Sequence, residues 1–282
     1  MDYQLLVLDV DGTATNSAKQ VTEKTRDAVI RLQERGVRVV IASGRAPNGV
    51  YPVAEALELP RFGSHILAFN GAKIIRLKNR VCLYERTLPT YIPEELWRDS
   101  QKYHLGFLTY KDDILAAGTK PDQYMALESE ISAMPIEYHR NFWETMDDAV
   151  NGCLLTGRPS RIREVEPILR EKYEQEVEMF RSEPCFLEVV PKDVDKARSL
   201  KRLLKRLNIP REAVVCCGDS FNDITMIQYA GVGVAMANAQ EELKLTADYV
   251  TQRDNDHDGV VEVIEKFFGN GSRTAPVAKI YH

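Results

Sequence analysis

The chain lacks any apolar run approaching the about 20 residues that a membrane-spanning helix requires. It also lacks a basic excess, because 37 Lys and Arg stand against 42 Asp and Glu, for a formal net charge of −5. This balance gives no reason to expect a nucleic acid or an acidic membrane surface as a partner. The first apolar run is too short for a signal peptide. We therefore expect neither a membrane nor a nucleic-acid partner.

Cysteine is scarce, and its spacing does not fit a metal site. The five cysteines, at positions 82, 153, 185, 216 and 217, form an odd set with no C-x-x-C pair. Such a set favours reduced, buried thiols, which fits a cytoplasmic protein. No histidine pairs with a serine or cysteine in a recognisable triad pattern, so nucleophilic catalysis of that kind has no support.

The N-terminal part of the chain alternates buried strands with a helix. At 282 residues the chain is long enough for one large domain or two ordinary ones. We expect strands over 4–9, 37–42 and 66–69, and a helix through residue 35 with Thr22 as its N-cap. This β-α-β alternation predicts an α/β fold with a Rossmann-like, doubly wound parallel sheet.

The rhythm changes after this first part. A hairpin over 73–85 precedes a mixture of amphipathic helices and short strands that predicts an α+β insert with an antiparallel sheet. After an apolar run over 186–190, the parallel pattern returns. We therefore expect a core domain of residues 1–84 and 188–282, with residues 85–187 inserted as a second domain. The last residues, 271–282, carry no period, and we expect them to trail loosely.

Two carboxylate clusters each follow a buried strand. The first is Asp9-Val-Asp11-Gly12, and the second runs from Asp219 to Asp223. Both clusters should meet at the carboxyl edge of the sheet, where such sheets bind ligands. Four carboxylates there would repel one another unless a cation lay among them, and hard oxygen ligands suit Mg²⁺. The sequence therefore predicts a metal-assisted phosphoryl site.

The first cluster has the groups for a double displacement. Asp9 and Asp11 are two residues apart, so in an extended strand their side chains leave on the same side. One carboxylate can attack phosphorus to form an acyl phosphate, which water then hydrolyses. The other can protonate the leaving oxygen and later deprotonate that water. The alternative is an Asx turn that ends a strand, which is common.

Several polar residues near other strand ends could bind a phosphoryl group. Ser43, Gly44 and Arg45 follow a strand and offer a hydroxyl, free backbone N–H groups and a cation. The alternative for this triplet is a plain helix cap. Asn70 precedes a glycine, so it is equally consistent with a turn.

A lysine and the second cluster complete the candidate set. Lys196 lies at an expected helix start, where a cation is slightly disfavoured unless it faces acids or a phosphate; nearby Lys192 is a rival. Asp219 is the best candidate metal ligand. Asn222 could donate to phosphoryl oxygens, and Asp223 could hold Lys196 or cap the following helix.

Taken together, these motifs resemble the haloacid dehalogenase superfamily of phosphatases, and specifically its Cof-like (class IIB) members with a large α/β cap. The match covers nearly the whole chain. Leu8-Asp9-Val-Asp11-Gly-Thr13 resembles the first family motif, and Ser43-Gly44-Arg45 resembles the second. The spacing from Pro191 resembles the stretch before the third-motif lysine and favours Lys196 over Lys192. Gly218 to Asp223 resembles the fourth, metal-binding motif.

The resemblance implies roles for these residues. Asp9 would be the nucleophile and Asp11 the acid and base, and Ser43 would bind the transferring phosphoryl group. Mg²⁺ would be held by Asp9, the backbone carbonyl of Asp11, and Asp219. Residues 85–187 would form a cap that closes over the site. Asp193 and Ala197 stand where the family usually has glycines, so the backbone around Lys196 is expected to differ in detail from the family pattern.

The resemblance therefore implies an enzyme, a Mg²⁺-dependent phosphatase that hydrolyses small phosphorylated metabolites, most of all sugar phosphates, through an aspartyl phosphate. One alternative is a phosphomutase of the same superfamily. Another is a non-catalytic phosphoryl receiver or regulatory protein, which needs neither the cap nor the second cluster. The cap aromatics are candidates for stacking on a substrate ring, although such residues are more often core: Trp97, Tyr110, Tyr124 and Trp143.

Overall fold

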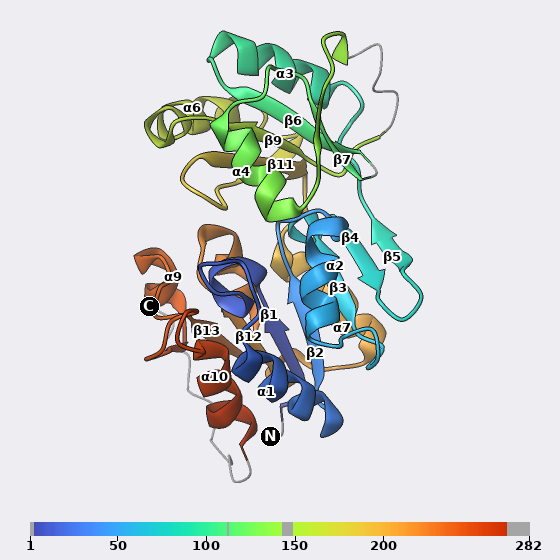
Figure 1. The fold of residues 1–282 in the computed structure, drawn as a ribbon, viewed down its shortest axis with the longest axis vertical. Helices are drawn as coiled ribbons and strands as arrows, with labels where there is room; N and C mark the ends of the chain where they lie inside the picture. Colours follow the sequence, from blue (N-terminus) through green and yellow to red (C-terminus); the bar gives the residue numbers. More distant parts are fainter. Residues whose placement is uncertain (1–2, 112, 143–148, 270–282) are drawn as a thin grey trace.

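The chain forms two sheets, one above the other, in a computed structural model that describes residues 3–111, 113–142 and 149–269 (Figure 1). The expectation for residues 271–282 lies outside the described residues. The lower sheet has eight strands and the upper sheet has six. The N-terminal and C-terminal parts of the chain both contribute to the lower sheet, and the middle of the chain builds the upper one. Each sheet together with its helices is called the lower unit or the upper unit below.

The lower sheet is parallel over most of its width. Its strand order is β14-β13-β12-β1-β2-β3-β4-β5. Only β4 runs antiparallel to its neighbours, β3 and β5, and with β5 it forms the expected hairpin. The bounds are β1 (Leu5–Leu8), β2 (Arg38–Ala42), β3 (His65–Ala68), β4 (Lys73–Arg76), β5 (Val81–Glu85), β12 (Val214–Gly218), β13 (Val232–Ala235) and β14 (Tyr249–Val250). The predicted Rossmann-like α/β fold is confirmed. Strand β1 pairs with both β2 and β12, so both carboxylate clusters follow neighbouring strands.

Helices cover both faces of this sheet. One face packs against α1 (Glu23–Glu34), α2 (Pro47–Ala56) and α10 (Gly259–Phe268), and the other against α7 (Lys196–Leu207), α8 (Ile224–Tyr229) and α9 (Glu241–Thr246). The side chain of Thr22 accepts a hydrogen bond from the backbone N–H of Thr25, so it is the N-cap of α1 as predicted. All four residues of β1 are fully buried between these layers.

The upper sheet is mostly antiparallel, in the order β10-β11-β9-β6-β7-β8. Its strands are β6 (Gly106–Lys111), β7 (Ile114–Ala117), β8 (Ile136–Tyr138), β9 (Cys153–Thr156), β10 (Val177–Phe180) and β11 (Phe186–Pro191). Helices α3 (Ile92–Lys102) and α6 (Pro159–Lys172) pack on one face. Helix α4 (Gln123–Ser132) packs on the other face, where Ala46 and Phe69 of the lower unit join the same apolar cluster. The face that carries α4 therefore faces the lower sheet (Figure 1).

Strand β11 differs from expectation. Its residues pair antiparallel with β9 and β10, so residues 188–191 belong to the upper sheet rather than to the core. A short apolar run has the same pattern in a buried strand of either sheet, so periodicity could not assign it. We therefore move the second domain boundary from 187/188 to a position after Pro191. The division into two domains stays a prediction.

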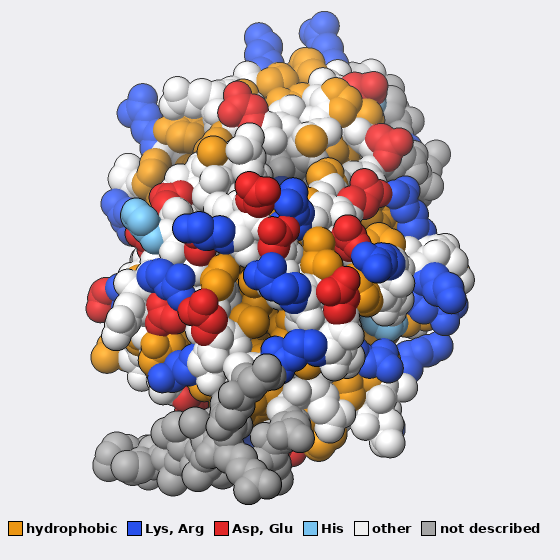
Figure 2. All heavy atoms as spheres, turned by 60° about the horizontal axis from the view of Figure 1, so that its bottom comes forward, with side chains coloured by type: hydrophobic (Ala, Val, Ile, Leu, Met, Phe, Trp, Pro, Cys, Tyr) orange, Lys and Arg blue, Asp and Glu red, His pale blue; other side chains and the backbone are white. Residues whose placement is uncertain are grey.

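Charges of both signs are interspersed on the face in Figure 2, at the end of the molecule away from the upper sheet. None of the helices within the described residues combines the length and the apolar character needed to cross a membrane. All five cysteines are free, and only Cys82 is exposed. The cytoplasmic location stays a prediction.

His65 of β3 gives the fold a dependence on pH. Burial, followed by the charges of Arg38, Arg76 and Arg206, lowers the pKa of His65 from 6.5 to about 4. The unfolded chain therefore binds a proton that the folded chain resists, and stability falls as the pH drops from 6.5 towards 4. We predict that the free energy of unfolding of the wild type, measured with urea, falls between pH 7 and pH 5 relative to that of His65→Gln. The relative loss should reach up to about 2 kcal/mol.

The exposed His104 provides the control for this measurement. His104→Gln makes the same substitution at a surface histidine, and its urea unfolding should show the pH dependence of the wild type. If the free energies of unfolding of wild type and His65→Gln changed equally between pH 7 and pH 5, this role of His65 would be contradicted.

Candidate active site

A buried lysine joins two carboxylates at the carboxyl edge of the lower sheet. Asp9 follows β1, and its backbone N–H donates to the carbonyl of Cys217 at 3.0 Å, which ties it to β12. Lys196 Nζ donates to Asp9 Oδ1 and to Asp223 Oδ1, each at 2.6 Å. The side chain of Lys196 is fully buried. Burial alone would lower the pKa of Lys196, but Asp223 and Asp9 hold it above its ordinary value.

The start of α7 explains how a lysine can lie there. Asp195 is the N-cap, and its carboxylate accepts from the backbone N–H of Arg198 at 2.8 Å. The cap satisfies one of the free donors of the first turn and offsets the positive end of the helix dipole. Lys196 therefore points into the site rather than into solvent, whereas the rival Lys192 pairs with Glu178 at 3.3 Å and stays partly exposed.

Asp219 lies opposite Asp9 across a tight turn. Thr13 Oγ1 donates to Asp219 Oδ1 at 3.0 Å. Gly12 has a φ of +74°, and a Cβ at this position would collide with the Asp219 carboxylate. Only glycine meets both conditions, so Gly12 brings the two predicted clusters into contact.

The carboxylates fit a hard cation. Asp9, Asp219 and Asp223 each offer an oxygen, and these oxygens lie within 4.8 Å of one another. Burial raises the pKa of Asp9 and of Asp219, and the neighbouring acids raise both further. Asp223 is less free to bind an ion, because Oδ1 accepts from Lys196 and Oδ2 accepts from the backbone N–H groups of Asp219 and Ser220. Asp9 and Asp219 are therefore the better pair of ligands.

Asp11 is held apart from this acidic group by two cations. Arg45 Nε donates to Asp11 Oδ2 at 2.7 Å and its terminal nitrogen donates to Oδ1 at 2.6 Å, while Lys19 Nζ donates to Oδ1 at 2.8 Å. Burial raises the pKa of Asp11, but these contacts lower it below its ordinary value overall. The carboxylate is thus held in its ionised form in this arrangement.

The remaining predicted residues come together beside Asp9. Ser43, Gly44 and Asn222 line one cavity with it. Asn222 Nδ2 donates to Asn70 Oδ1 at 3.0 Å, and the fully buried Asn70 has a φ of +52°. Each residue of the predicted set is therefore within one cluster; Arg45 also lines the cavity, and its guanidinium pairs with Asp11 there.

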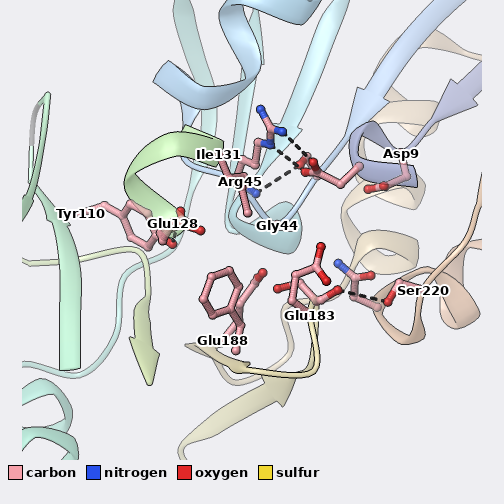
Figure 3. Close-up of a pocket in the computed structure, with 14 residues that line it drawn as sticks. Asp9, Gly44, Arg45, Tyr110, Glu128, Ile131, Glu183, Glu188 and Ser220 are labelled. Carbon is pink, nitrogen blue, oxygen red and sulfur yellow. Dashed lines mark hydrogen bonds and ion pairs between the residues drawn. The ribbon is translucent and has the colours of Figure 1, made fainter. Parts of the chain in front are cut away.

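This cavity has a volume of about 40 Å³ and lies between the two sheets (Figure 3). The upper unit closes it with residues that the sequence did not single out, above all Glu128 of α4, Glu183 of a loop and Glu188 of β11. A lone glutamate in the apolar strand Phe186–Pro191 was a signal for Glu188. Glu128 lies in an ordinary helical pattern and gave none.

The aromatic candidates have different positions. Tyr110 lines the cavity. Trp97 instead donates from Nε1 to the carbonyl of Gly118 at 2.7 Å, beside the core of the upper unit, and Tyr124 packs against the apolar cluster that faces the lower unit. Trp143 lies outside the described residues.

Comparisons with known proteins agree on one family. Residues 6–264 match the family model of the haloacid dehalogenase-like hydrolases. A haloacid dehalogenase-like hydrolase from Bacteroides thetaiotaomicron has a similar structure, with a TM-score of 0.86 and 41% identity over 94% of this chain and 99% of that one. TM0651 from Thermotoga maritima is similar at a TM-score of 0.76, with 29% identity over 93% of this chain and 97% of its own. The 5-amino-6-(5-phospho-D-ribitylamino)uracil phosphatase YcsE of Bacillus subtilis is 31% identical over 94% of this chain and 95% of its own length.

Removal of the buried lysine should destabilise the protein strongly. Lys196→Met would leave Asp9 and Asp223 buried without a counter-charge, so we predict a loss of about 3–5 kcal/mol in the free energy of unfolding. Urea unfolding at pH 7 with a chelator measures this loss independently of any activity.

Lys192→Met is the matched control, because it removes a partly exposed lysine from the same stretch. Its loss should stay below about 1 kcal/mol. Equal losses in the two variants would contradict the charge balance described above.

Proposed function

The chain belongs to the haloacid dehalogenase-like hydrolases, among the Cof-like phosphatases, and on that premise we propose that it hydrolyses small phosphate monoesters, with sugar phosphates as the favoured class, through an aspartyl phosphate on Asp9. The observation that carries the proposal is the contact of Asp9 with Lys196 beside Asp219. Three segments far apart in the sequence supply these groups, and Asp9 also lines a small cavity. A structural salt bridge would need neither the third carboxylate nor the cavity.

The first step transfers the phosphoryl group to the protein. An oxygen of the Asp9 carboxylate attacks phosphorus, and the bond from phosphorus to the leaving oxygen breaks. Lys196, together with donors from Ser43 and Asn222, would bind the phosphoryl oxygens. Asp11 would deliver the proton that the leaving oxygen takes up, which requires it to part from Arg45.

The second step restores the carboxylate. Asp11 removes a proton from water, and the resulting oxygen attacks the phosphorus of the aspartyl phosphate. The bond from phosphorus to Asp9 breaks, and inorganic phosphate leaves. The low pKa of Asp11 in its contact with Arg45 and Lys19 supports the ionised form that this step needs at its start.

Asp9, Asp219 and the backbone carbonyl of Asp11 would hold Mg²⁺. When bound there, the ion would neutralise negative charge on the phosphoryl oxygens. The crowding of acids that raises the pKa of both Asp9 and Asp219 supports this assignment.

The substrate class follows from the relatives and from the size of the site. YcsE is named for a substrate whose phosphate lies on a ribityl chain, which is a sugar alcohol. The cavity of about 40 Å³ holds roughly three water molecules, which suits a phosphoryl group beneath a closed cap. We therefore propose residues 85–191 as a cap that excludes water during the transfer.

Phosphate release from p-nitrophenyl phosphate and a panel of sugar phosphates, with Mg²⁺ and with chelator, tests the proposal. We predict release that needs Mg²⁺ and falls by at least about 10³-fold in Asp9→Asn, because the amide is nearly isosteric but cannot attack phosphorus. Residual activity in Asp9→Asn close to the wild type would contradict the role of Asp9.

The mutase alternative gives a different result in the same assay. A mutase returns the phosphoryl group to its substrate, so it would release little phosphate and would need a bisphosphate activator.

Asp248→Asn is the control for the substitution of Asp9 by Asn, because Asp248 accepts a hydrogen bond from the backbone N–H of Gly233, away from the cavity.

A further inference from the structure

The cavity above Asp9 has a wall of carboxyl groups that the proposed hydrolysis does not use. Glu128 from α4 and Glu188 from β11 both line it, and Figure 3 shows them on the side away from Asp9. Glu128 is only 5% exposed. The hydroxyl of Tyr110 donates to Glu128 Oε1 at 3.1 Å, so the glutamate acts as the acceptor in this pair. Carboxyl groups buried in this way are costly unless a ligand or a cation compensates them.

Within the described residues Glu128 and Glu188 feel the charges of Arg45 and Lys196, but these charges do not outweigh the effect of burial. Among the described residues that line the cavity, Arg45 is the one cation, and its guanidinium is taken by Asp11 and by the carbonyl of Gly49 at 2.9 Å. Burial, followed by the charge of Glu188, raises the pKa of Glu128 to about 8, and burial also raises the pKa of Glu188. Near neutral pH Glu128 is therefore mostly protonated, and the cap side of the cavity offers hydrogen-bonding carboxyl groups whose negative charge comes chiefly from Glu188.

Glu188 is fixed at the margin of the predicted phosphoryl-binding residues. Asn70 Nδ2 donates to its carboxylate. A Cβ on Gly44 would lie 2.6 Å from both Glu188 oxygens, so the carboxylate packs directly on that loop. With the phosphoryl group on Asp9, the first atoms of the leaving group beyond its oxygen would lie next to Glu188.

We propose that Glu128 and Glu188 determine specificity for the leaving group. They accept hydrogen bonds from its hydroxyl or ammonium groups and repel a second anionic group. The preferred substrates are then monophosphates of neutral polyhydroxy or amino compounds, while phosphorylated acids and bisphosphates are poor. This inference rests on the proposed function, because it assumes that the phosphoryl group is bound at Asp9.

A second cavity would favour an anionic leaving group, which is the opposite of the preference proposed above. It has a volume of about 510 Å³, meets the first at Asp11, Ser182, Glu183 and Ser220, and is lined by the exposed Arg163 and by Arg181. A leaving group directed wholly into it would favour a second anion. Asp9, Ser43 and Gly44 line only the smaller cavity of the two, which places the phosphoryl group and its nearest atoms beside the glutamates.

Three hexose derivatives that differ in charge test the proposal: glucosamine 6-phosphate, glucose 6-phosphate and 6-phosphogluconate. We expect the wild type to have a kcat/KM for the first two that exceeds that for the third by at least about tenfold, as repulsion between nearby carboxylates implies. The double variant Glu128→Gln with Glu188→Gln keeps the acceptors but removes the charge. It should reduce this ratio to below about threefold, mainly by raising kcat/KM for 6-phosphogluconate.

Glu178→Gln is the matched control, because Glu178 belongs to the same sheet but pairs with Lys192 outside the cavity. Its ratio should equal that of the wild type. Hydrolysis of p-nitrophenyl phosphate that depends on Asp9 reports the proposed function separately, and its absence would refute that function.

With that hydrolysis present, three results would overturn the inference alone. They are equal kcat/KM values for the three hexose derivatives in the wild type, a preference for 6-phosphogluconate, and failure to hydrolyse any of the three. A ratio that the double variant leaves unchanged would show that other groups set the selectivity.

Discussion

The pairing of Lys196 with Asp9 and Asp223 is the constraint on which the rest of the site depends. A fully buried ammonium must be compensated, and here two carboxylates from neighbouring strands do so at 2.6 Å each. The pairing fixes the end of β1, the start of α7 and the turn after β12 relative to one another. It also positions the Asp9 carboxylate so that one oxygen faces the lysine while the group still borders the cavity.

The two walls of the cavity differ in the charged groups that they present. The lower wall concentrates acids whose charge a bound cation would balance, together with Lys196, which pairs with Asp9 and Asp223. The upper wall adds Glu128 and Glu188, which would repel an anionic phosphoryl group. In the proposed role they contact the leaving group instead. A site that attracted anions from every side would release phosphate slowly.

The sequence predicted the lower unit well because its signals are local. Buried strands followed by acids, with Gly12 at a turn that only glycine can make, were enough to predict that Asp9 and Asp219 meet at one edge of the sheet. The position of β11 and the role of Glu128 could not be predicted in the same way. Both depend on how the upper sheet docks on the lower unit, and this docking leaves no period or spacing in the chain.

A crystal structure of the protein grown with Mg²⁺ and beryllium fluoride tests the central claim most directly. Beryllium fluoride mimics a phosphoryl group attached to a carboxylate. We predict that it is attached to Asp9, within hydrogen-bonding distance of Lys196 and with Mg²⁺ between Asp9 and Asp219. Attachment to Asp11, or a metal ion bound away from Asp219, would contradict it.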